Sequence, residues 1–137
     1  MRNSAAALGG WLLILSRLLI VYQPVSLAIS ASAALSSYPT RGPKVLVAVA
    51  LRIVVTGVCV AAGMALTNLS PSALSLTRVA LALSAASDIF ILTTPYYPNN
   101  RPPGDTPYYV AASIAYHGAW LLYLWRSVRV RKTFTAG

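Results

Sequence analysis

The sequence predicts an all-α integral membrane protein, a single-domain four-helix bundle over residues 1–137 with both termini in the cytoplasm. Four long apolar runs fill most of the chain. The composition is 57% hydrophobic and 9% charged, with a mean hydropathy of +0.65, values far from those of a soluble domain. The basic residues lie mostly at the ends of the apolar runs, where they act as topology signals rather than as a nucleic-acid-binding surface.

The first predicted span covers about residues 8–34, longer than a hydrocarbon core of ~30 Å requires at ~1.5 Å per residue. We interpret it as a retained span rather than a cleaved signal, because Arg17 interrupts its apolar core and three further spans follow. Pro24 predicts a bend, and Gln23 and Ser26 could bond the backbone groups that the proline frees. Residues 38–43 predict a turn.

The second and third predicted spans cover about residues 45–66 and 77–94. Each carries a stripe of small and polar side chains at helical spacing, which is typical of contact between membrane helices. We therefore expect both stripes to face the interior of the bundle. Their members are Ala48, Arg52, Thr56, Cys59 and Gly63 in the second span, and Thr77, Ala80, Ser84 and Asp88 in the third.

The fourth predicted span covers about residues 108–128 and is rich in aromatic side chains. Residues 95–107 precede it and hold five of the nine prolines, so they predict an exposed loop. Residues 129–137 predict a basic cytoplasmic tail. Six basic residues fall on the side of the termini (Arg2, Arg78, Arg126, Arg129, Arg131, Lys132) and three on the other (Arg41, Lys44, Arg101), which gives the predicted orientation.

Each span places one ionisable side chain near its middle: Arg17, Arg52, Asp88 and His117. Counted along the helices from the cytoplasmic side, they lie at depths of about 14 to 20 Å. A charge at such a depth costs on the order of 3 kcal/mol, so we expect the four side chains to face one another. Asp88 is the only acid in any span and should pair with Arg17 or Arg52.

One arginine of this cluster is then left without a protein anion. A bound anion, a lipid phosphate, backbone carbonyls or an acid of a partner subunit could neutralise it. The structural alternatives are that Arg17 extends to the membrane surface and that the ion pair fixes helix register. The cluster is therefore either structural or ligand-binding.

No catalytic site, metal site or cofactor is expected. His117 alone could ligate a haem or a chlorophyll-type pigment, but a hydrogen bond to Tyr22, Gln23 or Asp88 is the simpler fate for it. The single cysteine excludes a multi-thiolate site. The sequence has two carboxylates, Asp88 and Asp105, and Asp105 lies in the exposed loop, which disfavours acid–base chemistry by paired carboxylates.

Two terminal segments carry a family resemblance: Leu8-Gly9-Gly10-Trp11-Leu12-Leu13, and residues 119–134 with Trp, Tyr and a closing Ser-x-Arg-Val-x-x-Thr-Phe pattern. They resemble the YdgK-like family of small bacterial inner-membrane proteins, a domain of unknown function. The resemblance implies four membrane helices and no reaction or ligand. The matching positions are Gly9, Gly10, Trp11, Trp120, Tyr123, Ser127, Arg129, Val130, Thr133 and Phe134.

These observations favour a non-enzymatic accessory or interaction subunit of a larger membrane assembly, most simply in a bacterial inner membrane. Its expected partners are membrane lipids and other membrane subunits or further copies of itself, and no nucleic acid. The alternative is a binding or transport unit for a small anion or anionic lipid that uses Arg17, Arg52 and Asp88. An immunity or regulatory protein that recognises one membrane partner would use the same surfaces as the first hypothesis.

Overall fold

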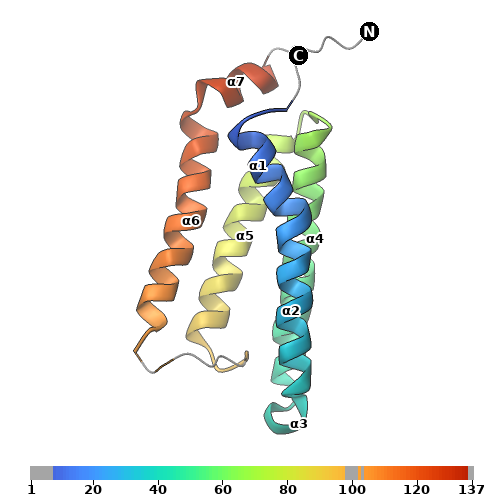
Figure 1. Ribbon diagram of the computed structural model, residues 1–137, viewed down its shortest axis with the longest axis vertical. Helices are drawn as coiled ribbons and strands as arrows, with labels where there is room; N and C mark the ends of the chain where they lie inside the picture. The colour runs from blue at the N-terminus through green and yellow to red at the C-terminus, as the bar shows by residue number, and fades with distance from the viewer. Residues whose placement is uncertain (1–7, 98–101, 103, 136–137) are drawn as a thin grey trace.

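The computed structural model describes residues 8–97, 102 and 104–135, and all regular structure in these ranges is helical. Four long helical segments run up and down and are connected by short turns and one proline-rich loop (Figure 1). The described helices are α1 (Trp11–Arg17), η2 (Leu18–Tyr22), α2 (Gln23–Ser36), α3 (Tyr38–Arg41), α4 (Lys44–Thr67), α5 (Ala73–Thr93), α6 (Thr106–Arg126) and α7 (Val128–Thr135).

The first segment is a continuous helix over Trp11–Ser36, here called helix 1, composed of α1, η2 and α2. Pro24 predicts a bend in this helix, and the backbone directly before it is π-helical. In this stretch the Gln23 N–H donates to the Leu18 carbonyl, five residues back. The expected bonds from the Gln23 and Ser26 side chains to freed backbone groups do not form in the described residues. Because a π turn already widens the backbone ahead of the proline, these two side chains are not needed to bond the freed backbone groups.

The α4–α5 hairpin forms the centre of the fold, and its stripes face inward as predicted. Cys59, Ala80 and Thr77 are fully buried, and Gly63 lies where α4 meets helix 1. A Cβ atom built at Gly63 would lie 2.6 Å from Ile20 Cγ1 and 3.1 Å from the Ser16 carbonyl oxygen. Glycine is therefore required for the close approach of these two helices.

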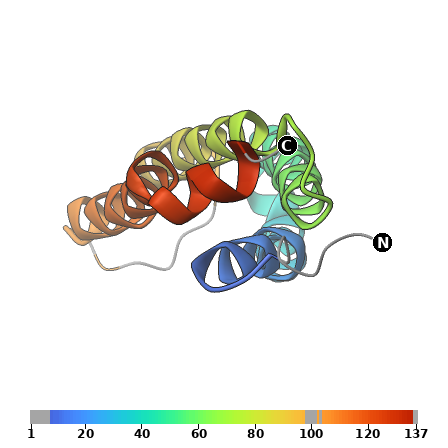
Figure 2. The same cartoon turned by 90° about the horizontal axis from the view of Figure 1, so that it is seen from above.

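The helices form an arc whose two ends meet near α7, where Leu12 of helix 1 and Leu124 of α6 belong to one core. Helix 1 packs mainly on α4, α4 on α5, and α5 on α6. Figure 2 looks along the helices and shows helix 1 and α6 at the two ends of the arc, with α7 crossing above. The main apolar core lies toward the α7 end, with Leu12, Leu66, Leu124 and Val130 among its members. The described residues form a smaller core at the far end, with Ala34, Val45 and Val49 as its buried members.

Two connecting segments are more regular than the sequence predicts. Residues 38–43 reverse the chain, but Tyr38–Arg41 adds one helical turn before Gly42, which has φ 73°. The predicted basic tail is mostly helical, because residues Val128–Thr135 form α7. Its Val130 is fully buried and its Phe134 packs against the main core, so an apolar stripe folds α7 back over the end of the bundle.

Among the residues that the structure describes, three helices are long and apolar enough to cross a membrane: Trp11–Ser36, Lys44–Thr67 and Ala73–Thr93. The predicted spans 8–34, 45–66 and 77–94 correspond to them with boundary differences of a few residues. The predicted fourth span, 108–128, corresponds to α6, which is as long as α5 but is not among these three. Both described ends of the chain lie at the α7 end of the molecule (Figure 1).

Candidate functional site

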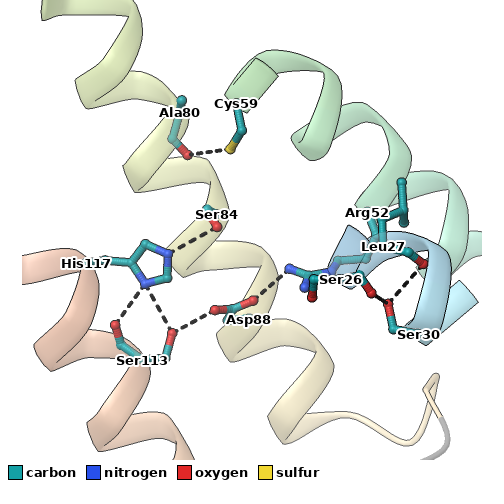
Figure 3. A network of polar contacts seen from close by, with 10 residues as sticks. All are labelled: Ser26, Leu27, Ser30, Arg52, Cys59, Ala80, Ser84, Asp88, Ser113 and His117. Carbon is teal, nitrogen blue, oxygen red and sulfur yellow. Dashed lines mark hydrogen bonds and ion pairs between the residues drawn. The ribbon is translucent and has the colours of Figure 1, made fainter. Parts of the chain in front are cut away.

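A network of polar side chains connects the middles of α4, α5 and α6. Arg52 Nη1 donates to Asp88 Oδ1 at 2.7 Å, and this is an ion pair between side chains that are 17% and 26% exposed. Ser113 Oγ donates to the second carboxylate oxygen, Asp88 Oδ2, at 2.9 Å. Figure 3 shows these side chains pointing toward one another from three different helices. We call Arg52, Ser84, Asp88, Ser113 and His117 the polar network.

His117 continues the network on the α6 side and is 3% exposed. Its Nδ1 lies 2.8 Å from the Ser113 carbonyl oxygen, and its Nε2 lies 3.1 Å from Ser84 Oγ. Because a carbonyl oxygen only accepts, Nδ1 carries the proton, and in the neutral imidazole Nε2 accepts from the Ser84 hydroxyl. The Tyr116 ring stands edge-on to the imidazole with centroids 5.0 Å apart. Both ring nitrogens are thus used by the protein.

Three of the four predicted ionisable residues therefore meet. Arg52, Asp88 and Ser113 lie roughly 20 Å along their helices from the α7 end, and His117 about one turn nearer to it, at ~1.5 Å per residue. The predicted pairing of Asp88 with one arginine is resolved in favour of Arg52. The predicted hydrogen bond of His117 goes to Ser84 and Ser113, not to Tyr22, Gln23 or Asp88. Ser113 lies one helical turn before His117, and Ser84 lies one helical turn before Asp88. Both serines could therefore have been predicted as members of the network from their spacing.

Arg17 does not join the network, and this part of the prediction was wrong. Helix 1 begins at Trp11 rather than at residue 8, so Arg17 lies only about 9 Å from its start. Its neighbours Leu15 and Ser16 face α4 and are fully buried, whereas Arg17 is exposed. No described side chain forms an ion pair with it. The surplus positive charge is thus displaced from the network toward the α7 end.

A crevice lies between the polar network and helix 1. Its volume is about 260 Å³, and its lining combines helix 1 with all three other long helices. The residues that line the crevice are Leu18, Tyr22, Gln23, Ser26, Arg52, Asp88, Ser113, Tyr116 and His117. An adjoining face of helix 1, which shares Leu18 and Tyr22 with the crevice, is apolar apart from Arg17 and carries Leu13, Ile14, Val21 and Val25.

The terminal motif residues gather at the α7 end, far along the chain from one another but close in space. The Trp11 and Trp120 rings meet edge to face with centroids 6.3 Å apart, and Trp120 meets Tyr123 at 6.0 Å. The Arg129 guanidinium lies against Gly10, where a Cβ atom would be 3.0 Å from Nη1. The two segments therefore form one structural joint between helix 1 and α7.

The remaining motif residues organise α7 locally. The Val130 N–H donates to Ser127 Oγ at 3.4 Å, and Thr133 Oγ1 donates to the Arg129 carbonyl at 2.9 Å. Gly9 precedes the helix 1 start and adopts no regular structure. The bonds of Ser127 and Thr133 lie at the start of α7 or within it, and none of the motif positions lines the crevice. These positions therefore support a fold-building role for the motif.

Within the described part of the chain, no three His, Cys, Asp or Glu side chains come together in a way that could hold a metal ion. The one cysteine, Cys59, is buried and lies 3.8 Å from the Ala80 carbonyl. The chain matches no protein-family model, and neither a curated protein nor a solved structure is significantly similar to it. The resemblance to the YdgK-like family accordingly stays a prediction.

Proposed function

We propose that this chain is a non-enzymatic interaction subunit of a larger assembly in a bacterial inner membrane. In this proposal α6 is the fourth membrane helix and both termini are cytoplasmic. The basic residues support this orientation, because Arg78, Arg126, Arg131 and Lys132 are exposed toward the α7 end and Arg41 and Lys44 toward the other. The 21 residues of α6 extend about 30 Å at ~1.5 Å per residue, which suffices for a bilayer core.

One observation carries the interaction proposal: the outward face of α6 has the pattern of a helix–helix contact. Exposed residues recur along it at alternating spacings of three and four, which is the repeat of packed helix pairs. The three central members are small and let another backbone approach closely. We call this face the α6 seam; it consists of Tyr108, Ala111, Ala115, Gly118, Leu122 and Trp125.

The seam is free for a partner as far as the described residues go, because none of them packs on it. Tyr108 and Trp125, at its two ends, are each 76% exposed, and a Cβ atom at Gly118 would meet nothing within 4 Å. The opposite face of α6 holds Ser113 and His117 and packs on α5. Aromatic rings at both ends of the seam also suit the two membrane interfaces.

Gly118→Leu tests this function, because it fills the seam at a position where a Cβ atom meets no neighbouring atom within 4 Å. After extraction in a mild detergent, native mass spectrometry should find the unmodified chain in a stable complex larger than one copy. Gly118→Leu should release the chain as a monomer with an unchanged melting temperature. Gly57→Leu is the matched control, since Gly57 is exposed on α4 and also has nothing within 4 Å. Recovery of the unmodified chain as a monodisperse monomer would refute the proposal.

The anion-binding alternative receives no support from the geometry. It requires an uncompensated arginine beside Asp88, but Arg52 is neutralised by that carboxylate and Arg17 lies elsewhere. A second anion at the crevice would face the Asp88 charge at close range, which disfavours binding.

A further inference from the structure

The crevice beside the polar network has the properties of a ligand site that the interaction proposal does not use. We propose that it binds an uncharged, oxygen-bearing amphiphile that enters from the lipid phase, with its polar head at Gln23, Ser26 and Arg52 and its hydrocarbon tail on helix 1. The shared chemistry is a carbonyl group attached to a hydrocarbon chain, as in a quinone or an acylglycerol. Four properties of the crevice lead to this class.

The first property is the charge balance. Arg52 and Asp88 neutralise each other at 2.7 Å, and the other polar groups that line the crevice are an amide, hydroxyls and an imidazole. The crevice therefore has no net charge when His117 is neutral. An ionic head group would have to be desolvated without a counter-charge, which costs several kcal/mol per ion as an order of magnitude.

The second property is an excess of hydrogen-bond donors. Both Asp88 oxygens already accept bonds, from Arg52 and Ser113. Arg52 has five N–H donors and uses one nitrogen for the ion pair. No described group bonds to the Gln23 amide or to the Ser26 hydroxyl, and both line the crevice. A ligand that offers acceptor oxygens would satisfy them.

The third property is depth. The Arg52–Asp88 pair lies roughly 20 Å along the helices from the α7 end. A phospholipid keeps its charged head group at the membrane surface, since moving a charge to such a depth costs on the order of 3 kcal/mol or more. Uncharged amphiphiles, by contrast, dissolve in the hydrocarbon interior and reach this level at much lower cost. The depth thus selects against ordinary phospholipids.

The fourth property is shape. The crevice holds about 260 Å³, the space of roughly nine waters at ~30 Å³ each, which suits one ring or one glyceryl ester. Next to it, the exposed side chains of Leu13, Ile14, Val21 and Val25 form an apolar face on helix 1. The crevice and this face share Leu18 and Tyr22, so a tail can lie along helix 1 while the head occupies the crevice. Figure 2 shows helix 1 and α6 at the two ends of the arc.

Three variants separate this site from the fold. Gln23→Leu with Ser26→Ala removes the two free donors and leaves every bond of the polar network in place. Ser30→Ala is the matched control on the same helix, because the Ser30 hydroxyl bonds to the Ser26 and Leu27 carbonyls and does not line the crevice. Arg17→Leu removes the exposed charge near the apolar face.

The experiment measures saturable binding to the detergent-solubilised full chain by native mass spectrometry. Three probes are used: a ubiquinone with a ten-carbon tail, dioctanoylglycerol, and the anionic dioctanoyl phosphatidate. One of the two uncharged probes should bind about one per chain, and which one binds identifies the head group. The double variant should weaken this binding at least tenfold, whereas Ser30→Ala should change it less than twofold. Arg17→Leu makes the tail face of helix 1 fully apolar and should not weaken the binding of an uncharged probe.

Each contrary result overturns the inference in a different way. Tighter binding of the phosphatidate, lost in Arg17→Leu, would show an anion site on helix 1. Equal binding to the double variant would place the ligand outside the crevice. The absence of saturable binding for both uncharged probes would show that the crevice is not a site for this class of ligand. None of these results affects the α6 seam, because Gly118→Leu acts on the opposite face of α6.

Discussion

Removal of one member of the Arg52–Asp88 pair should destabilise the protein much more than removal of both. Unit charges ~4 Å apart attract by about 4 kcal/mol at an effective dielectric constant of ~20. Loss of one partner of a buried pair typically costs about 3–5 kcal/mol, since the remaining charge is stranded. The two side chains are 17% and 26% exposed, so Arg52→Leu should fall at the lower end, about 3 kcal/mol.

Asp88→Leu should cost more than Arg52→Leu, because Asp88 also accepts the Ser113 hydroxyl at 2.9 Å. Loss of that bond adds about 1 kcal/mol, for a total near 4 kcal/mol. The double variant strands no charge and should lose only about 2 kcal/mol, which gives a coupling energy of about 5 kcal/mol.

The assay is reversible unfolding in mixed micelles with a denaturing detergent, monitored by tryptophan fluorescence. Arg17→Leu serves as the control for removal of an unpaired arginine from a helix and should change the unfolding free energy by less than ~1 kcal/mol. If the two single changes were additive in the double variant, the ion pair would not be the energetic link between α4 and α5, and the reasoning would be refuted.

Three further predictions concern packing. Gly63→Ala should lower stability by about 1–3 kcal/mol, since its methyl group would overlap Ile20, whereas Gly57→Ala, with open space around it, should be neutral or stabilising in a thermal-shift measurement. Ser87→Ala should stabilise the chain by about 1 kcal/mol or more, because the buried Ser87 hydroxyl has no partner; a lower melting temperature would contradict this. Val130→Asp should release α7 and accelerate trypsin cleavage there at least tenfold, whereas Val128→Asp, at a position 57% exposed, should not.

The inward direction of the polar stripes could be predicted from the sequence because helical spacing alone determines which residues share a face. Ala48, Thr56, Cys59 and Gly63 are buried on α4 for this reason, and the same periodicity places Thr77, Ala80 and Ser84 inside on α5. The meeting of Arg52 with Asp88 followed from depth and charge, because each partner lowers the cost of burying the other.

The position of Arg17 could not be predicted in the same way, because it depends on where helix 1 begins and on which face contacts α4. A start three residues later moves Arg17 about 4.5 Å toward the surface at ~1.5 Å per residue. The buried neighbours Leu15 and Ser16 then take the α4-facing side. Hydropathy identifies the apolar run, but it encodes neither the first helical residue of helix 1 nor the face that packs on α4.

The α7 helix was missed for a related reason. Its charged residues dominate the composition of the tail, so that the tail reads as polar and unattached. Val130 and Phe134, four residues apart, supply one apolar stripe on an otherwise basic helix. A stripe of two apolar residues is too short to predict a packed helix on its own. It can be recognised only once the surface that it covers is known, here the ends of helix 1 and α6.

The unequal distribution of the core explains why the polar network and the crevice occur at the same level. Near α7, large apolar side chains such as Leu12, Leu66 and Leu124 fill the space between helices. Farther along, helix 1 keeps only a small core with α4, around Ala34 and Val45, and no apolar cluster joins it to α6 in the described residues. Charge-assisted bonds replace apolar packing at this point and hold α4, α5 and α6 in register. Arg52 keeps unused N–H donors on the side of the crevice, toward helix 1. The polar network that holds α4, α5 and α6 together therefore also lines the crevice that helix 1 does not fill.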